Sequence, residues 1–165
     1  MYLGIDVGGS KIQGAYFRSS SRRRAVALTS RLATPASYET FLAALERLGR
    51  EAAQEGRALW RVCVGLPGTC SERRALWVPH LPYLNGRNLA EDLEGRLGVP
   101  VVLGNDAQLA LLGEVWRGAA RRRRSAALLS VGTGIGGALL LDGRIVRGVH
   151  GSAGAFGWLN FDYRC

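Results

Sequence analysis

Two glycine-rich segments, each between stretches of β-forming residues, are the first places in this sequence where chemistry is expected. They are Asp6-Val7-Gly8-Gly9-Ser10-Lys11 and Gly132-Thr133-Gly134-Ile135-Gly136-Gly137. Glycine lets backbone N–H groups approach an anion closely, and hydroxyl and lysine side chains add donors, so each segment suits a phosphate group. Neither segment matches the Walker or the Rossmann sequence. A glycine turn also closes ordinary hairpins, so each segment alone is explained by either role.

Two carboxylates stand next to predicted strand ends. Asp6 falls near the end of an apolar run that we expect to be buried, where an unpaired carboxylate is costly. A hydrated Mg²⁺ bound to nucleotide phosphates would satisfy it, and so would N–H groups of the turn. Asp106 follows Asn105 after a second apolar run and opens a predicted helix. That places it at the positive end of the helix and the carboxyl edge of a sheet, although helix capping explains the position equally well.

The elements that must position these residues follow from the spacing of apolar residues. Strands are predicted at residues 2–7, 12–17, 25–33, 59–66, 99–103, 125–131, 138–141 and 144–146, with a weak strand at 75–78 in an otherwise extended loop. Helices are predicted after the capping candidates Thr34 and Ser37, at 89–97 between Asn88 and Gly98, and at 105–116. This order describes one complete α/β unit followed by the beginning of a second.

The size and charge of the chain limit the classes of function. With 165 residues, 47% of them apolar, the chain suffices for one ordinary domain with a core but is short for a two-lobed enzyme. A formal net charge of +9 rests on 21 arginines and one lysine, Lys11. The arginines form runs at 22–24 and 121–124 without interleaved aromatic residues, which favours solvated loops over a nucleic-acid site.

Cysteine usage and hydropathy indicate a cytoplasmic protein. Cys63, Cys70 and Cys165 are an odd number without a CxxC pair, which argues against a disulfide framework or a structural zinc site. The N-terminal residues show no secretory signal pattern. The most apolar stretch, 126–141, is interrupted by glycines and too short to span a bilayer, so we expect no membrane role.

Five segments in a fixed order resemble a known family. They are DVGGSK at 6–11, VGLPG at 64–68, PHLPYLNGRNL at 79–89, LGVPVVLGNDAQLALLGE at 97–114 and GTGIGGALLLDGRIVRGVHGSAG at 132–154. Together they resemble the ROK family of sugar kinases and regulators, in the actin/hexokinase-like ATPase superfamily, from Met1 to about Asp162. The resemblance implies an α/β fold: an RNase-H-like lobe with a mixed sheet at 1–118, then the first strands of an incomplete second lobe at 119–165.

The resemblance also implies ATP, Mg²⁺ and transfer of the γ-phosphoryl group to a sugar hydroxyl. Carried over residue by residue, it makes Asp6 the residue that orients the hydrated metal. The phosphate loops would be formed by Gly8, Gly9, Ser10 and Lys11, and by Gly132, Thr133, Gly134 and Gly136. The sugar would be bound by Gly68, Asn105, Asp106 and Trp158, with Asp106 as the catalytic base.

The sequence departs from the family pattern at its C-terminal side. Where family kinases have AGE-x-GH, whose Glu and His hold sugar hydroxyls, residues 153–158 are AGAFGW, and Trp158 could instead stack on a sugar. The cysteine-rich zinc segment of many relatives is absent. We therefore expect a truncated or split kinase with weak or no activity as this chain, partnered by a missing second-lobe segment or a second copy in a homodimer. The alternatives are a non-catalytic sugar- or phosphate-binding module and an arginine-driven nucleic-acid binder.

Overall fold

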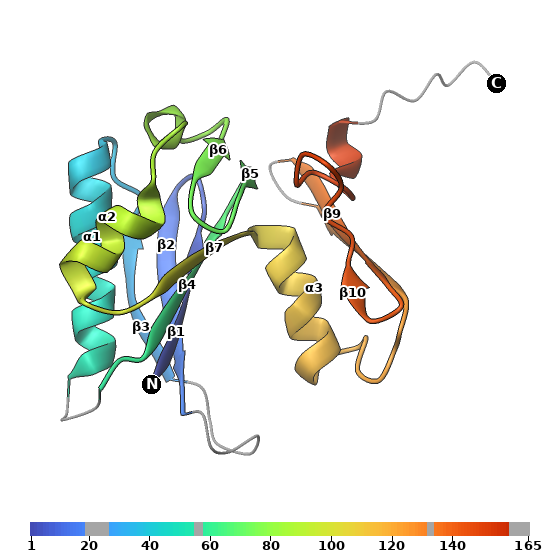
Figure 1. Ribbon diagram of the computed structural model, residues 1–165, viewed down its shortest axis with the longest axis horizontal. Helices are drawn as coiled ribbons and strands as arrows, with labels where there is room; N and C mark the ends of the chain where they lie inside the picture. The colour runs from blue at the N-terminus through green and yellow to red at the C-terminus, as the bar shows by residue number, and fades with distance from the viewer. Residues whose placement is uncertain (19–26, 55–57, 132–133, 159–165) are drawn as a thin grey trace. The chain divides into compact units, whose positions relative to one another are not determined.

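The computed structural model describes residues 1–18, 27–54, 58–131 and 134–158. The chain forms two compact units, Met1–Asp106 and Ala107–Cys165, which are described separately below (Figure 1). The lobe boundary expected after residue 118 differs from this division by about the length of one helix, α3 (Asp106–Arg117). The position of the family's lobe boundary stays a prediction.

Five strands form one mixed sheet in the first unit, in the order β3-β2-β1-β4-β7. Their bounds are Tyr2–Val7 for β1, Lys11–Phe17 for β2, Ala27–Ala33 for β3, Arg61–Leu66 for β4 and Val101–Asn105 for β7. The pairs β1–β2 and β2–β3 are antiparallel, whereas β1–β4 and β4–β7 are parallel. The predicted mixed α/β class is therefore confirmed, although residues 25 and 26 of the third predicted strand lie outside the described residues.

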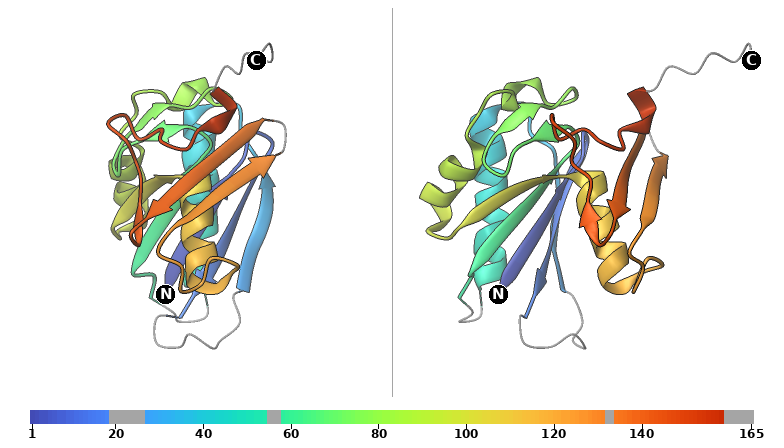
Figure 2. Two further views of the ribbon diagram at one scale, coloured as in Figure 1. Left: turned by 90° about the vertical axis from the view of Figure 1, so that its right-hand side faces the viewer. Right: turned by 45° about the vertical axis from the view of Figure 1, so that its right-hand side comes forward.

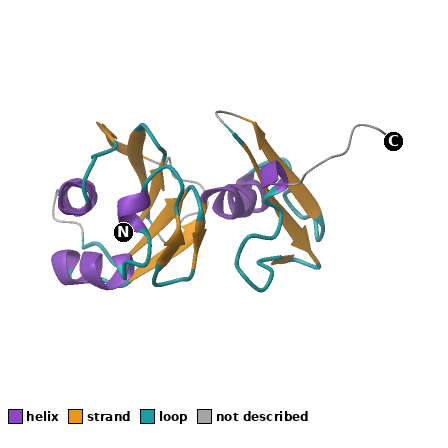
Figure 3. Cartoon of the chain, turned by 90° about the horizontal axis from the view of Figure 1, so that it is seen from above, coloured by secondary structure: helices purple, strands orange, loops and turns teal. Residues whose placement is uncertain are grey.

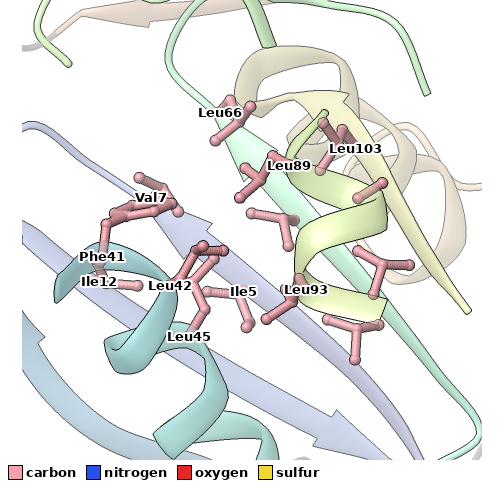
Figure 4. Packing of buried hydrophobic residues seen from close by; sticks show 14 of the residues in the cluster. Ile5, Val7, Ile12, Phe41, Leu42, Leu45, Leu66, Leu89, Leu93 and Leu103 are labelled. Atoms are coloured by element: carbon pink, nitrogen blue, oxygen red, sulfur yellow. The ribbon is translucent and has the colours of Figure 1, made fainter. Parts of the chain in front are cut away.

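Helices α1 (Tyr38–Ala53) and α2 (Leu89–Leu97) lie on one face of this sheet (Figure 3). Phe41, Leu42 and Leu45 of α1 point toward apolar side chains of β1 and β2, and Leu89 and Leu93 of α2 lie over β4 and β7 (Figure 4). All five leucine and phenylalanine side chains are buried. Burial of this apolar stripe, removed from water against the sheet, is what holds the layers together.

Two of the predicted helix caps behave as local rules predict, and a third does not. Ser37 is the N-cap of α1, and its hydroxyl accepts a hydrogen bond from the backbone of Thr40. Gly98 ends α2 with φ of 69°, a conformation that favours glycine. Asn88 occupies the N-cap position of α2 as expected, but its side chain makes no capping bond and donates instead to the Glu91 carboxylate.

The segment between β4 and α2 is more ordered than the sequence predicts. It contains the hairpin of β5 (Thr69–Cys70) and β6 (Ala75–Trp77), followed by the 3-10 turn η1 (Pro82–Leu84). Val78 and Leu84 are fully buried, so this segment is part of the core and not only an extended loop. Short elements of this kind are set by packing with distant residues, which hydrophobic periodicity does not reveal.

The edge strand β3 is partly covered by a side chain of α1. The Glu51 carboxylate accepts a hydrogen bond of 2.8 Å from the backbone N–H of Ser30. A polar groove of about 610 Å³ lies here, between β3 and α1.

The second unit contains α3, from Ala107 onward, and a three-stranded antiparallel sheet in the order β10-β9-β8 (Figure 2). The bounds are Ala126–Val131 for β8, Ile135–Leu141 for β9, Arg144–Ile145 for β10 and Phe156–Trp158 for the 3-10 turn η2. Among the described residues of this unit, the buried apolar cluster consists of Ala107, Leu111, Ala120, Ala138 and Leu140.

Of the arginine runs, 121–124 is exposed and lies in the turn region after α3, whereas 22–24 lies outside the described residues. In the part of the chain that the structure describes, no helix is long and apolar enough to cross a bilayer.

Glu94 joins α2 to the beginning of β7. Its carboxylate accepts two hydrogen bonds of 2.7 Å from the Arg73 guanidinium and one of 2.8 Å from the backbone N–H of Val101. Arg73 and then the Val101 N–H lower the pKa of Glu94 from its ordinary 4.5 to about 2.

We expect Glu94→Gln to lower the free energy of unfolding at pH 7 by an amount that shrinks on acidification. Because the folded-state pKa is depressed, the stabilisation is present above pH 4.5 and is lost as the pH falls toward 2. Urea denaturation of both proteins at pH 7, 4 and 2.5 measures the difference. A difference that stays constant over this range would contradict the assignment.

Candidate functional site

The parallel pairing of β1, β4 and β7 brings three strand ends to one edge of the sheet. In this register Asp6 lies opposite Gly65 of β4, which in turn lies opposite Gly104 of β7. Neighbouring strands are about 4.8 Å apart, so the end of β7 lies roughly 10 Å from β1. Asn105 ends β7 and Asp106 begins α3, so the structure brings these two residues and Asp6 to the same edge.

The structure corrects the expected burial of Asp6. Leu3, Ile5 and Val7 face the core, so Asp6 lies on the other face of β1 and its side chain is exposed. Burial therefore does not require a partner for this carboxylate.

The surroundings of Asp6 nevertheless suit a hydrated cation. At the same level of the sheet, Gly65 of β4 places no side chain beside Asp6, and the polar residue Gln13 of β2 lies opposite it on the other side. Among the described residues no three histidine, cysteine, aspartate or glutamate side chains group as a metal site. Mg²⁺ that keeps most of its waters, and is shared between one carboxylate and ligand phosphates, fits such a position.

The first glycine segment forms the turn between β1 and β2, as predicted. The backbone N–H of Gly8 donates to the Lys11 carbonyl at 2.8 Å. On the other side, the Thr34 hydroxyl donates to the Gly8 carbonyl at 2.7 Å and the Thr34 N–H to the Ser10 carbonyl at 3.1 Å. Gly9, Ser10 and Lys11 are exposed. From the sequence, Thr34 was predicted only as a helix-capping candidate, and its contacts with the turn were not predicted.

Two of the predicted sugar-binding residues lie together. The Asn105 side-chain amide donates a hydrogen bond of 3.1 Å to the Gly68 carbonyl, which orients the amide at the end of β7. Gly68 is packed so closely against β6 that a Cβ there would lie 2.3 Å from the Trp77 carbonyl oxygen. The glycine of the VGLPG segment is therefore required by packing, and its carbonyl is what contacts Asn105.

Asp106 is half-buried and is the first residue of α3. The N-terminal end of a helix carries partial positive charge, which favours a negative charge at this position. A carboxylate held there as an anion can accept a proton from a bound hydroxyl group.

Part of the second glycine segment belongs to β9, which begins at Ile135 and not at residue 138 as predicted. Gly132 and Thr133 lie outside the described residues, and Gly136 already belongs to β9 because Ile135 pairs with Val131. Nothing lies within 4 Å of a Cβ built at Gly134 or Gly136. Space at both positions is compatible with a ligand, but their phosphate-binding role stays a prediction.

The segment that replaces AGE-x-GH belongs to the second unit. Trp158 ends η2, and its side chain lies outside what the structure describes. Gln108 of α3 is 7% exposed, and its side-chain amide donates to the Gly151 carbonyl at 3.1 Å. The loop before η2 is thus tied to the helix that begins at Asp106, a contact that sequence reasoning missed.

Comparison with known proteins gives one consistent result. A sequence model of the ROK family matches residues 2–165. The N-acetyl-D-glucosamine kinase of Photobacterium profundum is 34% identical over 163 residues, which are 95% of this chain and 52% of that protein. The chain spans about half the length of the curated relatives it matches.

Solved structures agree with this result. A ROK family glucokinase from Streptomyces griseus, in complex with glucose and AMPPNP, has a TM-score of 0.83 at 30% identity, covering 96% of this chain and 50% of that one. An inorganic polyphosphate/ATP-glucomannokinase from Arthrobacter sp. strain KM has a TM-score of 0.82 at 27% identity, covering 98% and 64%. The predicted actin-like ATPase fold is confirmed.

We expect Gly68→Ala to destabilise the first unit, because the new methyl group would push against the β6 backbone. Overpacking of this kind costs about 1–3 kcal/mol. The matched control is Gly95→Ala in α2, where nothing lies within 4 Å of the added Cβ. In a helix that change stabilises by about 0.5–1 kcal/mol. The midpoint of urea denaturation should fall for Gly68→Ala and rise for Gly95→Ala relative to wild type. Equal shifts of the two midpoints would contradict the packing described for Gly68.

Proposed function

Because the chain belongs to the ROK family, we propose that it carries part of the site of a kinase that phosphorylates a sugar hydroxyl with ATP. The observation that supports this function most directly is the common sheet edge that holds Asp6, Asn105 and Asp106. Ligand sites of open α/β sheets gather at the carboxyl ends of the strands. The relatives named as kinases of glucose or N-acetyl-D-glucosamine point to a hexose or amino sugar as the acceptor.

In this mechanism the residues position groups and stabilise charge. Asn105, oriented by the Gly68 carbonyl, donates to or accepts from a sugar hydroxyl. Asp106 accepts the proton of the hydroxyl whose oxygen attacks the γ-phosphorus, and ADP leaves with the electrons of the broken phosphoanhydride bond.

The remaining residues handle the phosphates. The turn at Gly8–Lys11 and the segment at Gly132, Thr133, Gly134 and Gly136 bind phosphate oxygens through backbone N–H groups. Asp6 would hold a hydrated Mg²⁺ through one of its waters, and the metal would supply charge neutralisation at the phosphate oxygens.

A non-catalytic sugar- or phosphate-binding module is the second candidate. It is favoured by the AGAFGW segment at 153–158, which lacks the Glu and His that hold sugar hydroxyls in family kinases. Loss of polar partners in a sugar site lowers discrimination by orders of magnitude. Trp158 is proposed as an apolar contact for the sugar in either case.

We expect Asp106→Asn to lower the rate of sugar phosphorylation by about 10²–10⁴-fold, the usual contribution of a general base. Turnover is measured with Mg-ATP and a panel of glucose, N-acetylglucosamine and N-acetylmannosamine, and sugar affinity by calorimetry. The matched control is Asp142→Asn, at an exposed turn position with φ of 49° that asparagine tolerates.

The outcomes separate the two candidates. Turnover lost in Asp106→Asn but kept in Asp142→Asn supports the kinase. Undiminished turnover in Asp106→Asn would overturn the role of Asp106. Sugar binding by the wild-type chain without any turnover favours the non-catalytic module.

We also propose that the part of one face of the β8–β9 sheet that η2 leaves open is covered by further polypeptide of the same family. Leu129, Val131 and Ile135 share this face and are 63%, 74% and 52% exposed. Contiguous apolar surface of this kind is normally buried. Since the chain spans only about half of its relatives, the complementary half is the occupant we favour over a second copy.

We expect the half of the Photobacterium profundum kinase that this chain does not match to protect β8 and β9 from hydrogen exchange when the two are mixed. Leu129→Lys should abolish that protection. Leu28→Lys, which alters an equally exposed leucine (63%) in the first unit, should not. Self-association of the chain that Leu129→Lys disrupts, without any effect of the added half, would favour the homodimer instead.

A further inference from the structure

We infer that Thr34 is a positioning residue that holds the turn at Gly8–Lys11 in the conformation that binds phosphate. This inference rests on the proposed function, because it concerns the same turn. Thr34 follows β3 directly and is half-buried, whereas Gly9 and Ser10 at the tip of the turn are exposed. It therefore supports the turn from the side of β3 and leaves the tip accessible.

The contact with Gly8 is unusual for a hairpin. In a closed two-residue hairpin, Gly8 and Lys11 would exchange both backbone hydrogen bonds, with the Gly8 carbonyl accepting from the Lys11 N–H. Here the Gly8 N–H donates to the Lys11 carbonyl, but the Gly8 carbonyl accepts from the Thr34 hydroxyl at 2.7 Å. A side chain 26 residues away thus sets the orientation of this peptide group.

The orientation determines where the next amide points. The described chain contains no cis peptide bond, and in a trans peptide the carbonyl and the following N–H point in opposite directions. With the Gly8 carbonyl directed at Thr34, the Gly9 N–H points away from it. No described residue accepts a hydrogen bond from this N–H. An outward-pointing amide, without a Cβ on its own residue, is what a phosphate oxygen requires.

Thr34 is itself fixed by the core. Pro35 restricts the residue before it to extended backbone. The Pro35 carbonyl accepts a hydrogen bond of 2.6 Å from the Tyr83 hydroxyl, and the Tyr83 ring packs edge-on against Phe41 at 5.9 Å between centroids. Burial raises the pKa of Tyr83, so this hydroxyl stays protonated as a donor. The support of the turn thus extends from Phe41 in the core to the Gly8 carbonyl.

The test compares Thr34→Val, which keeps the shape but removes the hydroxyl, with Thr34→Ser, which keeps the hydroxyl. The probe is inorganic triphosphate with Mg²⁺, titrated by calorimetry, because it needs no adenosine pocket. We expect Thr34→Val to bind about threefold to tenfold more weakly, the equivalent of one hydrogen bond, and Thr34→Ser to match wild type. The ¹⁵N–¹H signal of Gly9 should shift in Thr34→Val, with thermal stability nearly unchanged.

Each result decides the inference. Weaker binding in Thr34→Val with rescue by Thr34→Ser supports it. Equal affinity of wild type and Thr34→Val overturns it but leaves the proposed kinase function intact. Equal weakening in both variants indicates packing and not the hydroxyl, and also overturns it. Absence of triphosphate binding by the wild-type chain overturns the phosphate role of the turn together with the inference.

Discussion

Hydrogen bonding between the parallel strands β1, β4 and β7 fixes the register of the strands, and with it the relative positions of Asp6 and Asn105 at the sheet edge. Parallel neighbours need crossover connections, and here α1 and α2 lie in those connections and cover a single face. Burial of leucines on that face therefore determines the geometry of polar groups at the sheet edge. The candidate chemistry depends on the core although it shares no residue with it.

The helices and strands whose apolar residues recur at regular spacing were predictable from the sequence. The elements that depend on contacts between residues distant in the sequence were not. Helix α1 follows from apolar residues at helical spacing after Ser37, which caps it as expected. The hairpin of β5 and β6 was missed because it depends on Gly68, whose lack of a side chain admits the Trp77 backbone. The early start of β9 likewise depends on the pairing of Ile135 with Val131, which no local pattern shows.

For the site, too, features set by local sequence were predictable and features set by long-range contacts were not. The turn at Gly8–Lys11 could be recognised from residue types alone, and the family resemblance supplied the roles of Asn105 and Asp106. The exposure of Asp6 was readable from the alternation of Leu3, Ile5 and Val7, since strand residues at odd and even positions face opposite sides. The hydrogen bond from Thr34 to Gly8 was not predictable, because it depends on how two antiparallel pairs place β3 beside the turn.

The hydrogen bond between Ser30 and Glu51 affects whether a strand of another molecule can pair with β3. β3 is an outer strand, and unpaired amides on such a strand are a template on which another chain can add itself. Glu51 occupies one of these amides with a carboxylate, so an incoming backbone would have to displace a charged group. Glu51 therefore disfavours the pairing of a foreign strand with β3 at Ser30.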